Sequence, residues 1–222
     1  LHASLPGAWP IMDIILTSRR SPLKVFVPWS PWTFMHRVMV VGASGLLGQH
    51  MMSAGREMGL AMTGTHNTVD QGPTVHMDIT DPDSVSRGME AACPELVVLC
   101  AAMTNVDQCE REPGSAYKVN MEGALNVASE CRSSGAKLVY ISTDYVFNGL
   151  KGARYHEFEP VDPLSIYAKS KLEGERVTLD ASRANLVCRV SVVRLEPLER
   201  EEQLRDLGHR FAAERAGDTV IR

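Results

Sequence analysis

The order of apolar and polar positions from residue 37 onward alternates between two kinds of segment. Short runs that are apolar at nearly every position predict strands buried on both faces of a parallel sheet. The longer, mixed segments between these runs predict helices. The predicted strands are 37–42, 60–65, 95–101, 137–143 and 185–193, and the predicted helices are 46–58, one capped by Thr80 or Asp81 and running to about Ala92, 115–133, and 165–179.

Strands that alternate with helices imply right-handed βαβ crossovers, because parallel neighbours need a connection that packs back onto the sheet. We therefore predict an α/β fold, a Rossmann-type doubly wound parallel sheet with helices on both faces. The alternating pattern covers residues 35–193, which we expect to form one domain.

The two ends of the chain do not follow this pattern. Residues 1–34 contain closely spaced prolines and tryptophans in "VPWSPWTF", and we expect an irregular N-terminal extension that precedes a natural start at Met35. An ordinary packed N-terminal arm is the alternative. Residues 194–222 are rich in charge and predict an atypical exposed segment, one helix that adds little to the core.

Composition narrows the functional classes. The 222 residues include 44% hydrophobic and 23% charged residues, as in ordinary soluble proteins. A net charge of −4 gives no general attraction to nucleic acid. No run approaches the ~18 apolar residues that span a membrane. Five cysteines without a CxxC pair or metal spacing indicate reduced thiols, no metal site, and a cytoplasmic protein.

A glycine-rich loop follows the first predicted strand. In "VGASGLLG", Gly42 permits a tight turn, Gly45 allows the backbone to approach a pyrophosphate, and Gly48 allows close packing of helix and strand. The N-terminus of the following helix supplies free N–H groups and a positive potential. A glycine triplet alone is weak evidence, but its place between strand and helix predicts a dinucleotide site and makes 35–193 an NAD(P)-binding domain.

The end of the second predicted strand bears on the choice of dinucleotide. The stretch "GTHNT" at 64–68 has no acidic residue, which would hold a ribose 2′-hydroxyl and repel a 2′-phosphate. We therefore favour NADP(H) over NAD(H), with Thr65, His66 and Asn67 as possible donors to the phosphate. A plain surface histidine at 66 is about equally compatible with the sequence.

Further residues fall at the carboxyl ends of predicted strands, where open α/β sheets bind ligands. Asp78 and Ile79 follow "TVHM", and the small residues Ala101 and Ala102 follow the strand that ends near Cys100. The segment 142–144, Ser-Thr-Asp, ends the strand at 137–143. Because these strand ends meet at one edge of the sheet, they predict a single crevice.

The stretch "PLSIYAKSKLEGE" places Tyr167 and Lys171 one helical turn apart on the same face. An ammonium group beside a phenol lowers the phenol's pKa from about 10, which would make Tyr167 a proton donor or acceptor near neutrality. Thr143 is placed to hold the reacting oxygen. Taken alone, a tyrosine and a lysine at this spacing more often lie on a solvent-exposed helix face.

Together, the glycine loop, "CAA", "STDYVFNG" and "YAKSK" resemble the extended short-chain dehydrogenase/reductase superfamily. Within it, "DITD", "STDYVFNG" and "YAKSKLEGE" look most like the dTDP-4-dehydrorhamnose reductases, and they are also similar to the β regulatory subunit of methionine adenosyltransferase. The resemblance covers about 37–193.

The resemblance implies NADPH-dependent reduction of a nucleotide-linked 4-keto sugar. Thr143, Tyr167 and Lys171 would form the catalytic trio, in which Tyr167 protonates the keto oxygen, Lys171 binds the nicotinamide ribose and Thr143 hydrogen-bonds the carbonyl. Asn120 would support this geometry. Asp144-Tyr145 stands where related dehydratases carry an Asp-Glu pair, so reduction is favoured over dehydration. The alternative implied is a non-catalytic, NADP-binding regulatory subunit.

The resemblance also assigns the cofactor contacts and the partners. Members continue into a C-terminal lobe that helps bind the sugar nucleotide, and we expect this chain to lack most of it, with a truncation or frame change near residue 194. Partners would be a nucleotide-sugar substrate and either a second copy in a homodimer or a catalytic subunit. The implied contacts are Gly42, Ser44, Gly45, Leu46 and Leu47 to the pyrophosphate, Asp78 and Ile79 to adenine, and Ala101 and Ala102 to the adjoining ribose.

Overall fold

The computed structural model describes residues 15–16, 23–24, 37–69 and 74–191. The chain divides into two compact units, Leu1–His36 and Arg37–Arg222. In the first unit, β1 (Ile15–Leu16) pairs in antiparallel orientation with β2 (Leu23–Lys24). The rest of the N-terminal extension and the charged segment 194–222 lie outside the described residues, so their predicted character stays a prediction.

The second unit is built on a six-stranded sheet in which every neighbouring pair is parallel. The strand order is β5-β4-β3-β6-β7-β8, which confirms the predicted doubly wound arrangement. The chain winds outward from the centre in both directions, so the order reverses between β3 and β6. The strands are β3 (Arg37–Val41), β4 (Ala61–His66), β5 (Thr74–His76), β6 (Leu96–Leu99), β7 (Lys137–Thr143) and β8 (Leu186–Val190).

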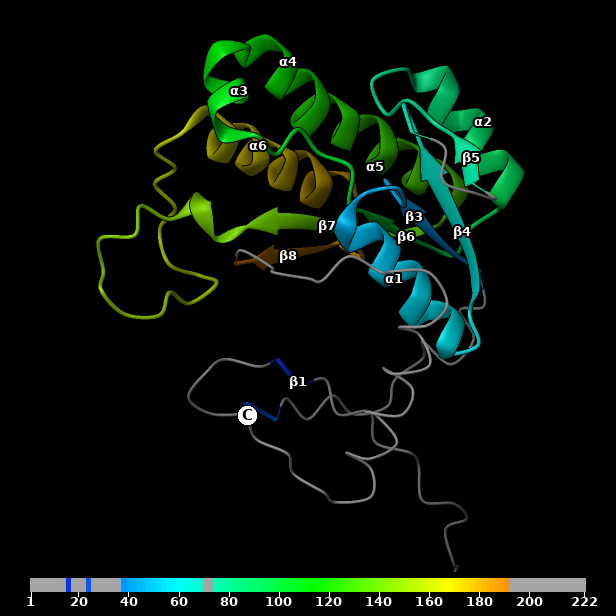
Figure 1. The fold of residues 1–222 in the computed structure, drawn as a ribbon, viewed down its shortest axis with the longest axis horizontal. Helices are drawn as coiled ribbons and strands as arrows, with labels where there is room; N and C mark the ends of the chain where they lie inside the picture. The colour runs from blue at the N-terminus through cyan, green and yellow to red at the C-terminus, as the bar shows by residue number, and fades with distance from the viewer. Residues whose placement is uncertain (1–14, 17–22, 25–36, 70–73, 192–222) are drawn as a thin grey trace, which may run out of the picture. The chain divides into compact units, whose positions relative to one another are not determined.

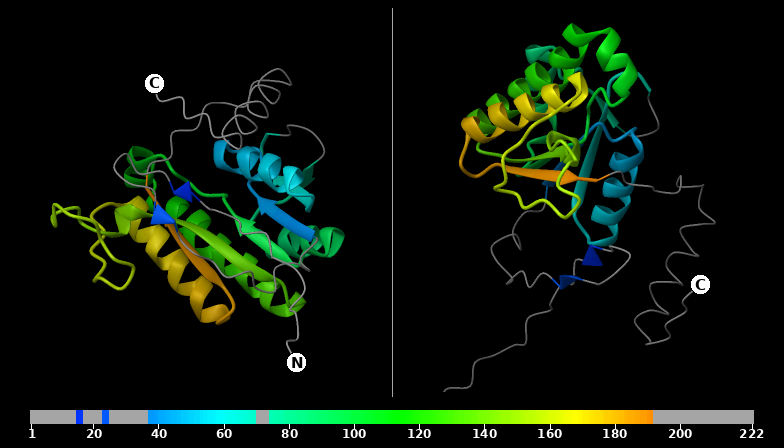
Figure 2. Two further views of the ribbon diagram at one scale, coloured as in Figure 1. Left: turned by 90° about the horizontal axis from the view of Figure 1, so that it is seen from below. Right: turned by 90° about the vertical axis from the view of Figure 1, so that its left-hand side faces the viewer.

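Helices lie on both faces of this sheet, as predicted. The first, α1, covers one face beside β3 and β4, whereas α2, α5 and α6 lie on the opposite face (Figures 1 and 2). Within the described residues, none of the helices has the length and apolarity required for a membrane crossing. The helices are α1 (Leu46–Glu57), α2 (Pro82–Ala92), α3 (Val106–Arg111), α4 (Pro113–Tyr117), α5 (Gly123–Ser134) and α6 (Ile166–Ala181).

The ends of the helices follow from local chemistry. Asp81, not Thr80, caps α2: its carboxylate accepts from the backbone N–H of Asp83, and Pro82 occupies the first turn. Helix α5 ends at Gly135, whose φ of 78° is the left-handed conformation that favours glycine. Ser165 accepts from the N–H of Ala168 and so begins α6.

The main apolar core lies between the sheet and the helices α2 and α5, and a smaller one lies under α1. These two layers explain why β3 is apolar on both faces, since Val38, Met39, Val40 and Val41 are all at most 5% exposed. The main core contains Met39, Val41, Met77, Ile79, Val85, Met89, Val97, Leu99, Ala124, Val127, Ala128, Cys131, Ala136, Leu138 and Tyr140.

The long helix predicted at 115–133 differs most from expectation. It starts earlier, as α4, and a π-helical segment (Lys118–Glu122) separates α4 from α5. The widened turn leaves the carbonyl of Asn120 to accept a hydrogen bond from the hydroxyl of Tyr140 at 3.1 Å. Helix α6 passes so close here that a Cβ at Gly174 would overlap both of these groups.

Candidate functional site

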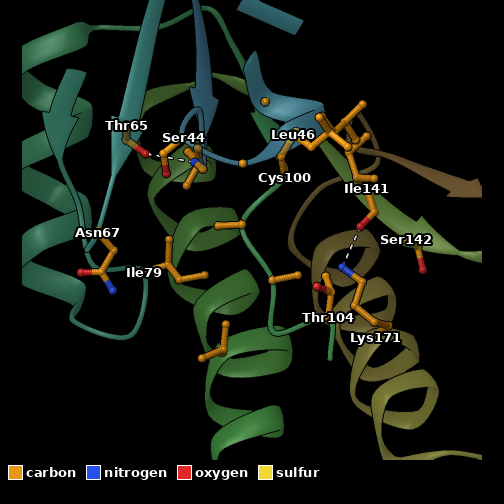
Figure 3. Close-up of a pocket in the computed structure, with 18 of the residues that line it drawn as sticks. Ser44, Leu46, Thr65, Asn67, Ile79, Cys100, Thr104, Ile141, Ser142 and Lys171 are labelled. Carbon is orange, nitrogen blue, oxygen red and sulfur yellow. Dashed lines mark hydrogen bonds between the residues drawn. The ribbon is translucent and has the colours of Figure 1, made fainter. Parts of the chain in front are cut away.

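A pocket of about 730 Å³ opens at the carboxyl ends of the strands, around the point where the strand order reverses. Its walls come from the glycine loop, the ends of β4 and β6, the segment after β5, the end of β7, and α6 (Figure 3). It is lined by every residue predicted for the site: Gly42, Ser44, Gly45, Leu46, Leu47, Gly48, His66, Asp78, Ile79, Ala101, Ala102, Thr143, Tyr167 and Lys171.

The glycine loop has the geometry that its spacing predicts. Gly42 has a φ of 88° and packs against Ala101, so close that a Cβ would lie 2.7 Å from the Ala101 nitrogen. A Cβ at Gly48 would overlap the carbonyl of Gly42. Gly45 is the N-cap of α1 and offers no side-chain cap, which leaves first-turn N–H groups of α1 available at the pocket.

The three polar residues predicted to bind a phosphate lie at the end of β4 and differ in their surroundings. Thr65 is 1% exposed, and its hydroxyl accepts from the N–H of Gly42 at 3.3 Å, so it holds the start of the glycine loop (Figure 3). His66 Nδ1 lies 2.6 Å from the hydroxyl of Thr74. Asn67 is exposed and lines the pocket. All three line the pocket, with Thr65 the most buried and Asn67 the most exposed.

The segment after β5 is held rigidly beside the pocket. The carboxylate of Asp78 accepts from both the N–H and the hydroxyl of Thr80 at 2.8 Å, while Asn126 on α5 donates to the carbonyl of Ile79 at 2.9 Å. These bonds hold the backbone of this segment, and Ile79, whose side chain packs into the core against Gly123, also lines the pocket (Figure 3). The arrangement suits a flat ring laid against it.

Thr143 and Tyr167 meet across the pocket from β7 and α6. Thr143 is 6% exposed, and its hydroxyl accepts from the N–H of Tyr145 at 3.2 Å. Burial raises the pKa of Tyr167, and hydrogen bonding by Thr143 partly opposes that rise. The expectation that Lys171 would bring this pKa toward neutrality is wrong for the chain alone, because the ammonium of Lys171 is directed elsewhere.

Lys171 is buried beneath the pocket, with 2% of its surface exposed. Its Nζ donates to the carbonyl of Ile141 at 2.7 Å and sits 4.0 Å from the centre of the Tyr140 ring (Figure 3). Burial lowers its pKa and the carboxylate of Glu175 partly opposes this, with a net pKa of about 7. Lys171 therefore lines the pocket, and its burial and the Glu175 carboxylate together determine its charge.

Asn120 joins three segments around Lys171. It is 1% exposed, accepts from the N–H of Met103 at 2.8 Å, and donates to the Met103 carbonyl at 3.0 Å. It also donates to the hydroxyl of Ser170 on α6 at 2.9 Å. Asn120 thus ties the chain after β6 to the helix that carries Tyr167 and Lys171.

Several pocket residues were not identified from the sequence. Thr104 follows the predicted strand that ends in "CAA", so its position just beyond a strand end was the available signal. Val119 lies in the π-helical segment, which no sequence pattern predicted. The other residues missed are Val41, Thr68, Met77, Thr80, Cys100, Val106, Ile141, Tyr145, Val190 and Ser191.

Comparison with known proteins places this pocket in context. The family model described as RmlD substrate binding domain matches residues 35–203. A curated relative named dTDP-4-dehydrorhamnose reductase, from Streptomyces griseus, is 41% identical over 144 residues, which are 65% of this chain and 45% of that protein. Methionine adenosyltransferase 2 subunit beta from Bos taurus is 32% identical over 71% of this chain and 47% of its own length.

A solved structure has the same fold. The crystal structure of dTDP-4-dehydrorhamnose reductase from Bacillus anthracis in complex with NADP superposes with a TM-score of 0.64 at 35% identity, covering 72% of this chain and 54% of that one. The chain therefore spans about half the length of the curated relatives it matches.

Proposed function

The chain belongs to the RmlD substrate binding domain family, and from this premise we propose that it provides the cofactor-binding and proton-donating half of an NADPH-dependent reductase acting on a nucleotide-linked 4-keto sugar. One observation carries the proposal. Thr143, Tyr167 and Lys171, which stand on two different elements, converge on the same pocket as the glycine loop. A dinucleotide site without acid–base groups would favour a simple binding protein.

The pocket suits a nicotinamide dinucleotide. The N-terminus of α1 faces it through residues without bulky polar side chains, and Gly45 presents only backbone toward the position of a pyrophosphate. Ala101 and Ala102 leave room for a ribose beside Gly42. His66 and Asn67, with no acidic residue between 64 and 68, support NADP(H) rather than NAD(H). When bound, the cofactor supplies a hydride.

The chain's own residues supply the proton. Because burial raises the pKa of Tyr167, its phenol stays neutral at physiological pH and holds the proton that a reduced carbonyl oxygen needs. The Thr143 hydroxyl, which hydrogen-bonds Tyr167, holds the same oxygen in line. Lys171, protonated, stabilises the phenolate that remains after transfer and binds the nicotinamide ribose.

Turnover tests the proposal directly. NADPH is mixed with the protein and dTDP-4-dehydrorhamnose, and the loss of NADPH absorbance is followed, with UDP-glucose as a control that offers no keto group. We expect NADPH binding and oxidation that depends on the 4-keto sugar. A protein that does not bind NADPH would contradict the proposal, as would oxidation at equal rates with both sugars.

A second function is favoured by one observation, the 32% identity to a methionine adenosyltransferase β subunit. In that case the chain binds NADP without reducing a sugar and associates with a catalytic subunit. NADPH binding without turnover, together with co-purification of a catalytic partner, would favour this function. Keto-sugar-dependent oxidation would exclude a purely regulatory role.

Substitution of Gly45 by alanine separates cofactor binding from folding. The added Cβ meets only the Gly42 carbonyl, at 3.4 Å, so we expect the free energy of unfolding to change by less than about 1 kcal/mol. The methyl group would occupy the space of the pyrophosphate, and we expect NADPH affinity to fall by about tenfold or more. Calorimetric titration measures the affinity.

The matched control is Gly114→Ala, since a Cβ at Gly114 on α4 meets nothing within 4 Å and this residue is not part of the pocket lining. Its NADPH affinity should match that of the unmodified chain. If Gly45→Ala also binds normally, the glycine loop does not hold the pyrophosphate.

A further inference from the structure

A charged cluster lies directly beneath the pocket, outside the proposed trio. Glu175 stands one turn beyond Lys171 on α6 and is 2% exposed. Its carboxylate accepts from the hydroxyl of Ser142 on β7 at 2.5 Å, and from Arg189 on β8 at 2.6 Å through Nη2 and 2.9 Å through Nε. Glu175 therefore connects α6 to the ends of two strands.

Burying the Glu175 carboxylate costs free energy, and this cost bears on the role of the residue. A buried ion pair seldom stabilises a fold more than apolar side chains of the same size would, because both charges lose their hydration. Arg189 is held further by the carbonyl of Glu157 at 3.1 Å and lies 5.2 Å from the centre of the Phe147 ring. So much support for one buried carboxylate points to a task other than stability.

The side chain that this carboxylate influences is Lys171, because a nearby negative charge favours the ammonium form of a lysine. Its ammonium lies on the Ile141 carbonyl and the Tyr140 ring, and no carboxylate of the described residues is within ion-pair distance of it. The titratable or charged groups that act on it are Glu175 from α6 and Cys100 after β6, with the Tyr140 ring of β7 against it and Arg189 behind Glu175. Among these, only Glu175 carries a negative charge at neutral pH.

We propose that Glu175 is a positioning residue: held by Arg189, its carboxylate favours the ammonium form of Lys171 and fixes Ser142, the residue before Thr143. The catalytic importance of Glu175 rests on the proposed function. Its effect on the charge of Lys171 needs no bound ligand. Glu175 does not touch the pocket, and it acts through Lys171 and Ser142.

Loss of the Glu175 charge would lower the pKa of Lys171. The pKa of Lys171 is about 7, because its burial lowers it by more than Glu175, the largest influence in the opposite direction, raises it. Loss of the negative charge therefore makes the lysine neutral at physiological pH. A neutral amine no longer stabilises a phenolate on Tyr167.

Titration of Lys171 by NMR tests this, with 13C at the lysine ε positions and Lys171→Met to assign its signal. In Glu175→Gln, which keeps the shape of the side chain, we expect the midpoint to fall by about one pH unit or more, a tenfold loss of proton affinity. Glu175→Asp keeps the charge and should keep the midpoint near its original value. A merely structural role would disturb both variants without moving the midpoint.

The matched control is Glu173→Gln on the same helix, where the lost carboxylate pairs with Arg176 at 2.5 Å on the surface. Its Lys171 midpoint should not move. If Glu175→Gln does not fold, Glu175→Gln with Arg189→Gln replaces the ion pair by two amides and should show the same fall. An unchanged midpoint in the folded variant overturns the proposal, whether or not the protein reduces a sugar.

The pH dependence of stability gives a second measurement. The pKa of Lys171 is near 7 in the folded chain and 10.5 when unperturbed, so between these values the folded chain binds fewer protons than the unfolded one. The free energy of unfolding should therefore rise as the pH increases from about 7 toward 9. In Glu175→Gln this rise should begin at lower pH, and in Lys171→Met it should be absent.

Above pH 9 the cysteines reverse the slope. Burial raises the pKa of both Cys100 and Cys131 to about 12 from an ordinary value of 9.0. The unfolded chain then releases protons that the folded chain keeps, which lowers stability as pH rises. The comparison of variants is therefore made below pH 9. A rise that starts at the same pH in Glu175→Gln and the unmodified chain would contradict the proposal.

Discussion

Tyr167→Phe is expected to lower the turnover of a 4-keto sugar by about 10³-fold, since loss of a positioned general acid costs 10²–10⁴. The variant removes one oxygen from a ring that packs edge-on against Tyr145, with centroids 6.2 Å apart, so the packing should survive. NADPH affinity should stay within about twofold, because the glycine loop and α1 are unchanged. The turnover number and the NADPH affinity are measured separately.

The control for this substitution is Tyr155→Phe. The hydroxyl of Tyr155 bonds Asn148 at 2.9 Å, the ring stacks on Phe147, and the residue is not part of the pocket lining. Its turnover should match that of the unmodified protein. If Tyr167→Phe turns over normally while NADPH still binds, another group donates the proton and the proposed role of Tyr167 is wrong.

The direction of the Tyr167 pKa also predicts the pH range of activity. A phenol whose pKa is raised by burial keeps its proton through neutral and mildly alkaline pH, as a donor must. Lys171, in contrast, loses its charge near pH 7 in the chain without ligands. On the alkaline side we therefore expect the lysine, not the tyrosine, to limit activity first.

The sequence predicted the sheet and the pocket for one physical reason. Apolar runs such as 95–101 and 137–143 identify strands of a parallel sheet, and the carboxyl ends of parallel strands share one edge. Residues as distant as Gly42 and Tyr167 then meet without any contact being known. Helix caps added the ends of the helices, although Thr80 and Asp81 were equivalent until the structure showed which side chain bonds the first turn.

What the sequence missed depends on contacts between elements. The π-helical segment at Lys118–Glu122 is stabilised by Tyr140 on β7 and by the absence of a side chain at Gly174 on α6, neither of which is local. Thr65 looked like a phosphate donor because its position at a strand end is visible, whereas its burial under Gly42 is not. The direction of the Lys171 ammonium was hidden for the same reason.

Asn120→Ala is expected to be the most destabilising single change at the site. It removes three hydrogen bonds at once: the N–H of Met103 loses its acceptor, and the Met103 carbonyl and the Ser170 hydroxyl each lose a donor. Each buried polar group left without a partner costs about 1–3 kcal/mol, so we expect a loss of roughly 3 kcal/mol or more. For a domain of this size that lowers the melting temperature by about 6–12 °C.

The matched control is Asn126→Ala, which removes a single bond, to the carbonyl of Ile79, from a half-buried position on α5. Its cost should be about 1 kcal/mol, as for one ordinary hydrogen bond. Chemical unfolding measures both variants. Equal losses would mean that Asn120 does not join the segment after β6 to α6. A larger loss in Asn120→Ala, with NADPH affinity reduced in the folded fraction, would mean that one amide supports both the fold and the geometry around Lys171.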